Sequence, residues 1–341
     1  MSTLENPQQI QQAVQILNEG KVVGMPTETV YGLAARVDMP SAIEAIFKTK
    51  ERPFFDPLIV HVSDQSQLKA VIREFPHIAK LLADHFWPGP LTLILPKHGD
   101  LNPMITAGLD NVGVRMPSHP VALELIRSVG VPLAAPSANK FGKTSPTTAG
   151  HVRDEFKKEN VFVLEGGDSQ IGIESTVLLV KAGGNANELS ILRKGHVLKS
   201  DIEKFLASTQ LPFSFVEITD KKESPGHMKH HYMPSVPLIV CTDLKITDSQ
   251  LKFIIESRMA ELPDMIEEVQ IVKPVGEIRR LEKLVLSEDP LIAARQFYAQ
   301  LRTLAELSPD CLVLHKLPEH SSERWDSLFD RVNKAASLIV N

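Results

Sequence analysis

Four polar side chains in two short segments could together bind a polyphosphate. Lys50 and Arg52 lie one residue apart, and Ser137 and Asn139 lie one residue apart much later in the chain. Phosphate oxygens require fixed positive charge together with hydroxyl and amide donors, and a guanidinium can bind two of these oxygens at once. We therefore interpret the two segments as parts of one nucleotide site.

The elements next to these segments predict how they are positioned. An amphipathic helix at 41–49 precedes Lys50 and Arg52, an apolar strand at 57–62 follows them, and a strand at 131–135 precedes Ser137 and Asn139. Taken alone, the first pair could equally be a solvated charge cluster that complements a helix dipole, and the second pair could simply form a turn.

A Walker A loop is an alternative reading of residues 137–144. Every required position matches except the first, where Ser137 replaces the glycine. We reject this alternative because that glycine supplies the turn of the loop.

Bulk composition indicates a packed globular protein. The chain has 341 residues, of which 43% are hydrophobic and 23% are charged, and its net charge of -5 argues against nonspecific coating of nucleic acid. The two cysteines, Cys241 and Cys311, have no metal-ligand spacing. The N-terminus lacks the pattern of a secretory signal and no apolar run could span a bilayer, so we expect a cytoplasmic protein without membrane contact.

The order of predicted elements indicates two domains joined by a linker. Up to residue 207, strands and helices mix less regularly than in repeated β-α-β units, which predicts a twisted mixed sheet flanked by helices. Residues 208–235 are rich in proline, lysine and histidine and predict a linker. In residues 236–341 we expect a small Rossmann-like α/β domain, with strands at 237–241, 269–272 and 311–314 and helices at 249–262, 291–307 and 323–338.

Further motifs lie in the same order as those of a known family. They are Pro-Thr-Glu-Thr-Val-Tyr-Gly-Leu at 26–33, Gly-Val-Arg-Met-Pro at 113–117, Ser-Pro-Thr at 145–147, Glu-Ser-Thr-Val at 174–177, and Ser-Pro-Gly at 224–226 followed by His231, Tyr232 and Pro234. With the Lys-x-Arg and Ser-x-Asn segments, they resemble the YrdC-like family of threonylcarbamoyl-AMP synthases, in its long two-domain form with a YrdC-like catalytic domain at 1–207.

This resemblance implies a nucleotidyltransferase reaction with three substrates. L-Threonine and bicarbonate would form a carbamate that attacks the α-phosphorus of ATP, giving threonylcarbamoyl-AMP and pyrophosphate. Mg²⁺ would be bound with ATP. A separate tRNA threonylcarbamoyl transferase would use the product to modify the tRNA adenosine next to the anticodon. The resemblance also suggests tRNA as a partner that this chain could contact directly.

The resemblance also implies a role for individual residues. The catalytic group would be Lys50, Arg52, Ser137 and Asn139. The threonine pocket would consist of Thr29, His61, Arg115, the backbone of Ala135, and Ser175, whereas ATP would contact Arg52, Asp56, Asn111, Ser137, Ser145, Arg193 and Tyr232. No protein side chain is expected to bind a metal ion directly. On the linker, Tyr232 could close over the site, or it could instead be an aromatic that fixes the linker to a domain.

Two other functions compete with this interpretation. The first is an RNA-binding module without its own catalysis, but such a module has no need for an amino-acid pocket containing Arg115 and Ser175. The second is a carbamoyl transferase of hydrogenase maturation, whose zinc-finger cysteines this chain lacks.

Overall fold

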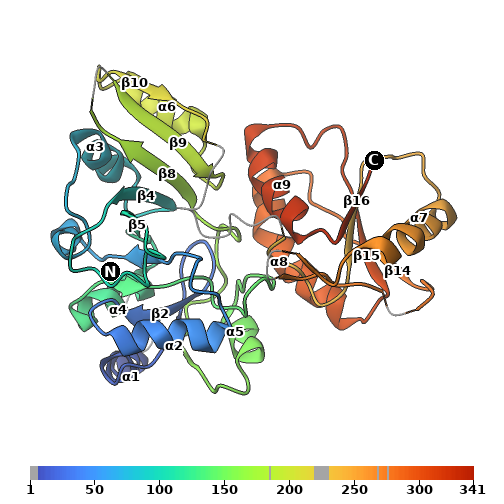
Figure 1. Cartoon of the computed structure of the whole chain (residues 1–341), viewed down its shortest axis with the longest axis horizontal. Coiled ribbons are helices and arrows are strands. Elements are labelled where there is room, and N and C mark those ends of the chain that lie inside the picture. Colours follow the sequence, from blue (N-terminus) through green and yellow to red (C-terminus); the bar gives the residue numbers. More distant parts are fainter. Residues whose placement is uncertain (1–6, 184–185, 219–229, 267–268, 275) are drawn as a thin grey trace. The chain divides into compact units, whose positions relative to one another are not determined.

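The chain divides into two compact units. The computed structural model describes residues 7–183, 186–218, 230–266, 269–274 and 276–341 (Figure 1). One unit comprises Met1–Lys140 and Pro146–His227, and the other comprises Phe141–Ser145 and Met228–Asn341. The residues Ser224-Pro225-Gly226 of the linker motif lie outside the described part of the chain. None of the helices in the described ranges combines the length and the apolar character that crossing a bilayer requires.

A large mixed sheet forms the centre of the first unit. Its order is β10-β9-β8-β4-β5-β3-β6-β2-β1-β7, with parallel pairing of β3 with β5 and of β4 with β8 and antiparallel pairing between most other neighbours. The described strands are β1 (Val23–Met25), β2 (Gly32–Arg36), β3 (Ile59–His61), β4 (Leu91–Pro96), β5 (Asn111–Arg115), β6 (Leu133–Ala134), β7 (Phe162–Val163), β8 (Thr176–Lys181), β9 (Asn187–Arg193) and β10 (Phe213–Phe215). The predicted mixed sheet is confirmed.

Helices cover this sheet in two groups (Figure 1). They are α1 (Pro7–Asn18), α2 (Pro40–Lys50), α3 (His77–Phe86), α4 (Pro120–Val129), α5 (Ala149–Glu155) and α6 (Lys199–Ala207), with a 3-10 turn η1 at Gln65–Ala70. Helices α1, α2 and α4 lie around β1 and β2, whereas α3 and α6 lie beside β4 and β8–β10. The largest apolar core includes the buried faces of α2, α3 and α6.

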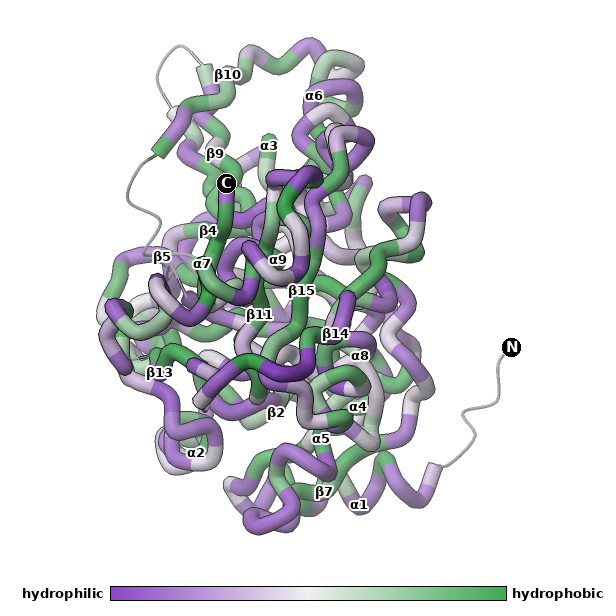
Figure 2. The backbone as a smooth tube through the Cα atoms, turned by 90° about the vertical axis from the view of Figure 1, so that its right-hand side faces the viewer, coloured by the Kyte–Doolittle hydropathy of each residue, from purple (hydrophilic) through white to green (hydrophobic). Residues whose placement is uncertain are grey.

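A parallel sheet of order β14-β15-β11-β16 forms the centre of the second unit. Its elements are β11 (Leu238–Cys241), α7 (Asp248–Glu261), β14 (Leu281–Lys283), α8 (Pro290–Glu306), β15 (Cys311–His315), α9 (Glu323–Ala335) and β16 (Leu338–Val340). Helix α7 packs on one face of the sheet, and α8 and α9 lie on the other (Figure 1). The tube is hydrophobic along β11 and β15, as expected for strands covered on both faces (Figure 2). The predicted small α/β domain is confirmed.

Two predicted elements of the second unit are wrong in detail. The strand predicted at 269–272 does not join the sheet, because β13 (Val269–Gln270) pairs with β12 (Met265–Ile266) in a separate antiparallel hairpin. The helix predicted at 323–338 ends at Ala335, and β16 follows it as a strand parallel to β11. A short apolar run does not reveal by periodicity whether it extends a helix or adds a strand, so tertiary pairing decides.

The segment Phe141–Ser145 folds with the second unit, although both flanking stretches fold with the first. Met233 N donates to Gly142 O at 2.8 Å, and Thr144 N donates to Met233 O at 3.1 Å. Arg302 donates to Thr144 O. Phe141 packs against the apolar cluster that contains Met233 and Val269. Backbone pairing and apolar burial thus assign these five residues to the second unit.

Candidate active site

Two motifs that are far apart in the sequence pair through their backbones. Leu33 N donates to Pro136 O, and Ala138 N donates to Tyr31 O, both at 2.8 Å. Gly32 lies opposite Ser137 in this short bridge, and a Cβ at Gly32 would lie 3.1 Å from the Cβ of Ala135, tighter than most such contacts. The close approach therefore favours glycine, and the pairing fixes the path of the Ser-x-Asn segment.

Lys50 is buried at the end of α2 and contacts the same segment. This helix begins at Pro40 and ends at Lys50, and its C-cap residue Glu51 has φ 53°. The ammonium of Lys50 donates to Ser137 O at 2.5 Å and also to Asn139 O. Burial holds the pKa of Lys50 well below its usual range, and the charge of Arg52 lowers it further. The structure therefore brings Lys50, Ser137 and Asn139 together, with the ammonium on backbone carbonyls of the segment.

Arg52 forms a buried ion pair with Asp56. Its Nη2 lies 2.8 Å from Asp56 Oδ2 and donates to Pro57 O at 2.8 Å, while its Nε donates to Asp56 O at 3.2 Å. The Asp56 carboxylate is fully buried. Since the Arg52 charge lowers the pKa of Lys50, the two predicted cations lie in one local field, where an anion would stabilise both.

The far end of the Ser-x-Asn segment is fixed by acidic side chains. Lys140 N donates to Glu155 Oε1 at 3.0 Å. The Lys140 ammonium pairs with Glu51 at 2.8 Å and with Glu159 at 2.6 Å. Solvent reaches these ion pairs, so each contributes little to stability.

A second cluster surrounds Arg115 at the end of β5. His61, the last residue of β3, lies opposite Arg115 in the parallel register. Arg115 Nη1 donates to Thr29 Oγ1 at 3.0 Å, and its Nη2 lies 3.4 Å from Glu28 Oε2. Burial lowers the pKa of Arg115, and the charge of Glu28 opposes this effect. The structure thus brings together three predicted residues, Thr29, His61 and Arg115, and adds Glu28, which sequence reasoning missed.

His61 is neutral in this environment. Burial and the charge of Arg115 lower its pKa to about 3. Its Nδ1 lies 3.2 Å from Ile59 O. A neutral imidazole can accept or donate one hydrogen bond here, but it supplies no positive charge.

Ser175 and Arg193 continue the second cluster. Arg193 donates from Nη2 to Ser175 Oγ at 3.0 Å and from Nε to Ser175 O at 3.1 Å. The positive charge of Arg193 also lowers the pKa of Arg115, which places both guanidinium groups in one field. Thr92 Oγ1 lies 2.8 Å from Ser175 Oγ. Sequence reasoning missed Thr92, and the available signal was a hydroxyl residue inside the apolar strand at 91–95.

The backbone near Ser175 is closely packed. A Cβ on Gly195 would lie only 2.3 Å from Thr176 N and 2.6 Å from Ser175 C, which no real side chain could tolerate. Glycine at this position therefore allows the strand pair β8 and β9 to present Ser175 and Arg193 together.

Of the remaining predicted residues, Ala135 lies beside the second cluster and the others lie elsewhere in the fold. The amide of Ala135 donates at 3.0 Å to Ile59 O, the carbonyl that His61 Nδ1 approaches. Asn111 begins β5 whereas Arg115 ends it, so about 13 Å of strand separates their backbones. Ser145 and Tyr232 belong to the second unit, where Tyr232 is almost fully buried and its ring centroid lies 5.7 Å from that of Tyr298. The ATP contacts predicted for Asn111, Ser145 and Tyr232 remain predictions.

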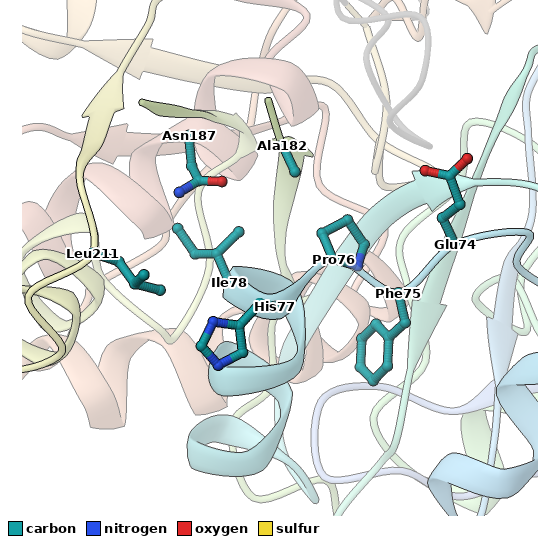
Figure 3. A pocket seen from close by; sticks show the side chains of 8 residues that line it. All are labelled: Glu74, Phe75, Pro76, His77, Ile78, Ala182, Asn187 and Leu211. Carbon is teal, nitrogen blue, oxygen red and sulfur yellow. The ribbon is translucent and has the colours of Figure 1, made fainter. Parts of the chain in front are cut away.

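A cavity of about 620 Å³ lies beside the start of α3. Figure 3 shows its lining side chains, which are Glu74, Phe75, Pro76, His77, Ile78, Ala182, Asn187 and Leu211. None of the predicted site residues is among them. Within the described ranges there is also no group of three or more His, Cys, Asp or Glu side chains that could bind a metal ion.

Comparisons with known proteins agree with both units. Residues 15–195 match the family Sua5_yciO_yrdC, described as "Telomere recombination", and residues 197–337 match Sua5_C, "Threonylcarbamoyl-AMP synthase, C-terminal domain". The threonylcarbamoyl-AMP synthase of Bacillus subtilis is 44% identical over 238 residues, which cover 69% of this chain and 67% of that protein. This chain belongs to the threonylcarbamoyl-AMP synthase family.

Members of this family also match over nearly the whole chain. The threonylcarbamoyl-AMP synthase of Schizosaccharomyces pombe is 30% identical and covers 99% of this chain and 89% of its own length. The crystal structure of Pyrococcus abyssi Sua5 complexed with L-threonine is similar with a TM-score of 0.79 and 31% identity, covering 97% of this chain and 96% of that chain. The resemblance inferred from the motifs is thereby confirmed, as is the expectation of an enzyme of the nucleotidyltransferase type.

Proposed function

We propose that this chain forms threonylcarbamoyl-AMP, pyrophosphate and water from L-threonine, bicarbonate and ATP. One observation carries the proposal: buried cations lie in two clusters, with Lys50 and Arg52 at the end of α2 and just after it, and Arg115 at the end of β5. His61 on β3 is in register with Arg115 on β5 and with Leu133 on β6, the strand that leads into the Ser-x-Asn segment. One cluster suits a polyphosphate and the other suits an amino acid.

The chemistry explains the need for cations. The threonine carbamate is an anion and ATP is a polyanion, and two unit charges about 4 Å apart repel by roughly 4 kcal/mol at an effective dielectric constant near 20. In the proposed step a carboxylate oxygen of the carbamate forms a bond to the α-phosphorus, and the bond to pyrophosphate breaks. Lys50 and Arg52 reduce the repulsion, and the hydroxyl of Ser137 and the amide of Asn139 donate to the phosphate oxygens.

The donors present suit a magnesium ion that arrives with the nucleotide. Mg²⁺ prefers oxygen ligands and is commonly bound through substrate phosphates with few protein ligands. The only carboxylate that we assign to the nucleotide side is Asp56, which is paired with Arg52. Phosphate oxygens would therefore supply most of the ligands, and the bound ion would neutralise phosphate charge.

The proposed product is a substrate for tRNA modification. A separate tRNA threonylcarbamoyl transferase would transfer the threonylcarbamoyl group to the adenosine next to the anticodon. The net charge of -5 gives the chain no overall electrostatic attraction to RNA, so any tRNA contact would be local. The cytoplasmic location remains a prediction from the sequence. Nothing in the part of the chain that the structure describes favours the RNA-binding module without catalysis.

Pyrophosphate release tests the proposal. The purified full chain with ATP and Mg²⁺ should release pyrophosphate only when threonine and bicarbonate are both present. The Arg52→Ala variant should lose about 10²- to 10³-fold in rate, because one charged donor is removed from the site. Release that does not depend on threonine would refute the proposed function.

A further inference from the structure

Glu28 is a buried carboxylate with one unused oxygen. The residue is only 4% exposed. Its Oε2 pairs with Arg115 at 3.4 Å, whereas its Oε1 has no hydrogen-bond partner among the residues that the structure describes. In the same described part of the chain, Nε of Arg115 is a buried donor without a hydrogen-bond acceptor. One buried ion pair thus presents both an open acceptor and an open donor.

Neighbouring polar groups are already engaged. Thr29 Oγ1 accepts from Arg115 and lies 2.9 Å from Thr27 Oγ1, which contacts Val30 O at 2.6 Å. His61 Nδ1 lies against the carbonyl of Ile59. These side chains therefore provide no obvious partner for the open oxygen of Glu28.

The backbone around Glu28 is held in place. Ile171 N donates to Glu28 O at 2.8 Å, and Gly172 N donates to Thr29 O at 3.1 Å. Ser169 Oγ donates to Thr27 O at 3.1 Å. A loop that is hydrogen-bonded at three successive residues cannot readily turn the carboxylate toward solvent. Oε1 of Glu28 therefore keeps its buried position in the folded chain.

Buried polar atoms without partners are rare and often mark ligand positions. A ligand that satisfies both atoms must carry an acceptor for Arg115 and a donor for Glu28. The α-carboxylate and the ammonium of a free amino acid meet this requirement. The charges also match, because the cation of Arg115 would face the ligand carboxylate and the anion of Glu28 would face the ligand ammonium.

We propose that Glu28 binds the amino group of the amino-acid substrate while Arg115 binds its carboxylate. This inference rests on the proposed function and deepens it, since it assigns the amine of threonine a partner. Glu28 would thereby orient the nitrogen that becomes part of the carbamate. A hydroxy acid would offer Glu28 a neutral hydroxyl donor in place of a cation and would leave the two buried carboxylates facing the single charge of Arg115, so the site selects free amino acids over hydroxy acids.

Calorimetric binding to the full chain tests this assignment with three ligands. They are L-threonine, 2,3-dihydroxybutanoate, which has a hydroxyl in place of the amine, and threoninol, which keeps the amine but has no carboxylate. The wild-type chain should bind threonine at least about tenfold more tightly than either analogue. In Glu28→Gln, threonine should bind about 10- to 100-fold more weakly, and the preference over dihydroxybutanoate should largely disappear while the preference over threoninol persists.

Two variants separate binding from a structural effect. Asp56→Asn alters a second buried carboxylate that pairs with an arginine, and it should leave the affinity for threonine unchanged while raising KM for ATP. Glu28→Asp keeps the charge and should retain part of the preference for threonine over dihydroxybutanoate, which provides the test if Glu28→Gln does not fold. Equal weakening of all three ligands in the Glu28 variants, or no weakening, would overturn the inference.

The outcome also distinguishes this inference from the proposed function. A wild-type chain that binds no threonine contradicts the proposed function and the inference together. A wild-type chain that releases pyrophosphate in a threonine-dependent way, with ligand preferences that do not change in Glu28→Gln, overturns only the role of Glu28.

Discussion

Replacing Lys50 with methionine should separate catalysis from stability. The Lys50 ammonium lies 2.5 Å from Ser137 O and donates also to Asn139 O. Methionine has a similar length and fills the same buried space, but it carries no charge and no donor. The substitution therefore removes one cation of the site and releases the segment that carries Ser137 and Asn139.

Two opposing effects determine the change in stability. Each carbonyl that loses its donor in a buried place costs about 1 to 3 kcal/mol. Removing the charge also removes its desolvation penalty, which is the main reason that the pKa of Lys50 lies well below its usual range. We therefore expect the free energy of unfolding to fall by less than about 3 kcal/mol, whereas turnover should fall at least about 10²-fold.

Chemical denaturation and pyrophosphate release measure the two quantities in Lys50→Met. The matched control is Lys140→Met. Among the residues that the structure describes, the Lys140 ammonium pairs with the solvent-accessible carboxylates of Glu51 and Glu159, and loss of such pairs costs about 1 kcal/mol or less. A folded Lys50→Met variant with turnover within about threefold of wild type would show that our reasoning about this site is wrong.

Two further predictions concern pH and the second unit. The pKa of Lys50 is lower in the folded chain than in the unfolded chain, so the folded state binds fewer protons at pH values between the two pKa values. The stability that Lys50 contributes is therefore complete above its ordinary pKa of 10.5. It is lost as pH falls through the lowered pKa. The wild type should therefore gain stability relative to Lys50→Met as pH rises through this window, and a difference in unfolding free energy that stays constant with pH would contradict the assignment. Truncation after Pro234 removes Val269 and Arg302, which contact the segment Phe141–Ser145. Turnover should therefore fall by more than about tenfold, and a protease should cut near Phe141 more readily. A truncated chain with unchanged turnover and unchanged cleavage would contradict this prediction.

Local sequence predicted where the side chains around Lys50 and Arg115 lie along the chain, whereas their roles came from the family resemblance. Lys50 follows an amphipathic helix, and His61 and Arg115 end apolar strands, so these positions follow from the pattern. Pairing of β3 with β5 then brings His61 and Arg115 into register. The role of Lys50 as a donor to backbone carbonyls could not be read in this way, because it depends on the path of a segment much later in the chain.

Features that depend on distant partners were not predictable. The apolar run that forms β16 could equally be the end of a helix or a short strand. Only its pairing with β11 shows that it is a strand. The polar sequence of β14 gives no strand pattern. Thr92 and Glu28 have neighbours in the sequence that suggest nothing unusual, and their significance lies in what each one contacts or leaves unsatisfied.

The five residues Phe141–Ser145 make the chain pass between its two units three times, at 140/141, 145/146 and 227/228. A module joined at one end can be inherited, exchanged or fused as a cassette, because a single cut releases it whole. Here a cut in the linker would leave the C-terminal fragment without part of its own fold, and that part would stay with the other piece. Recombination or engineering at the linker alone would therefore yield two incomplete products, each of which would need the other to complete its packing.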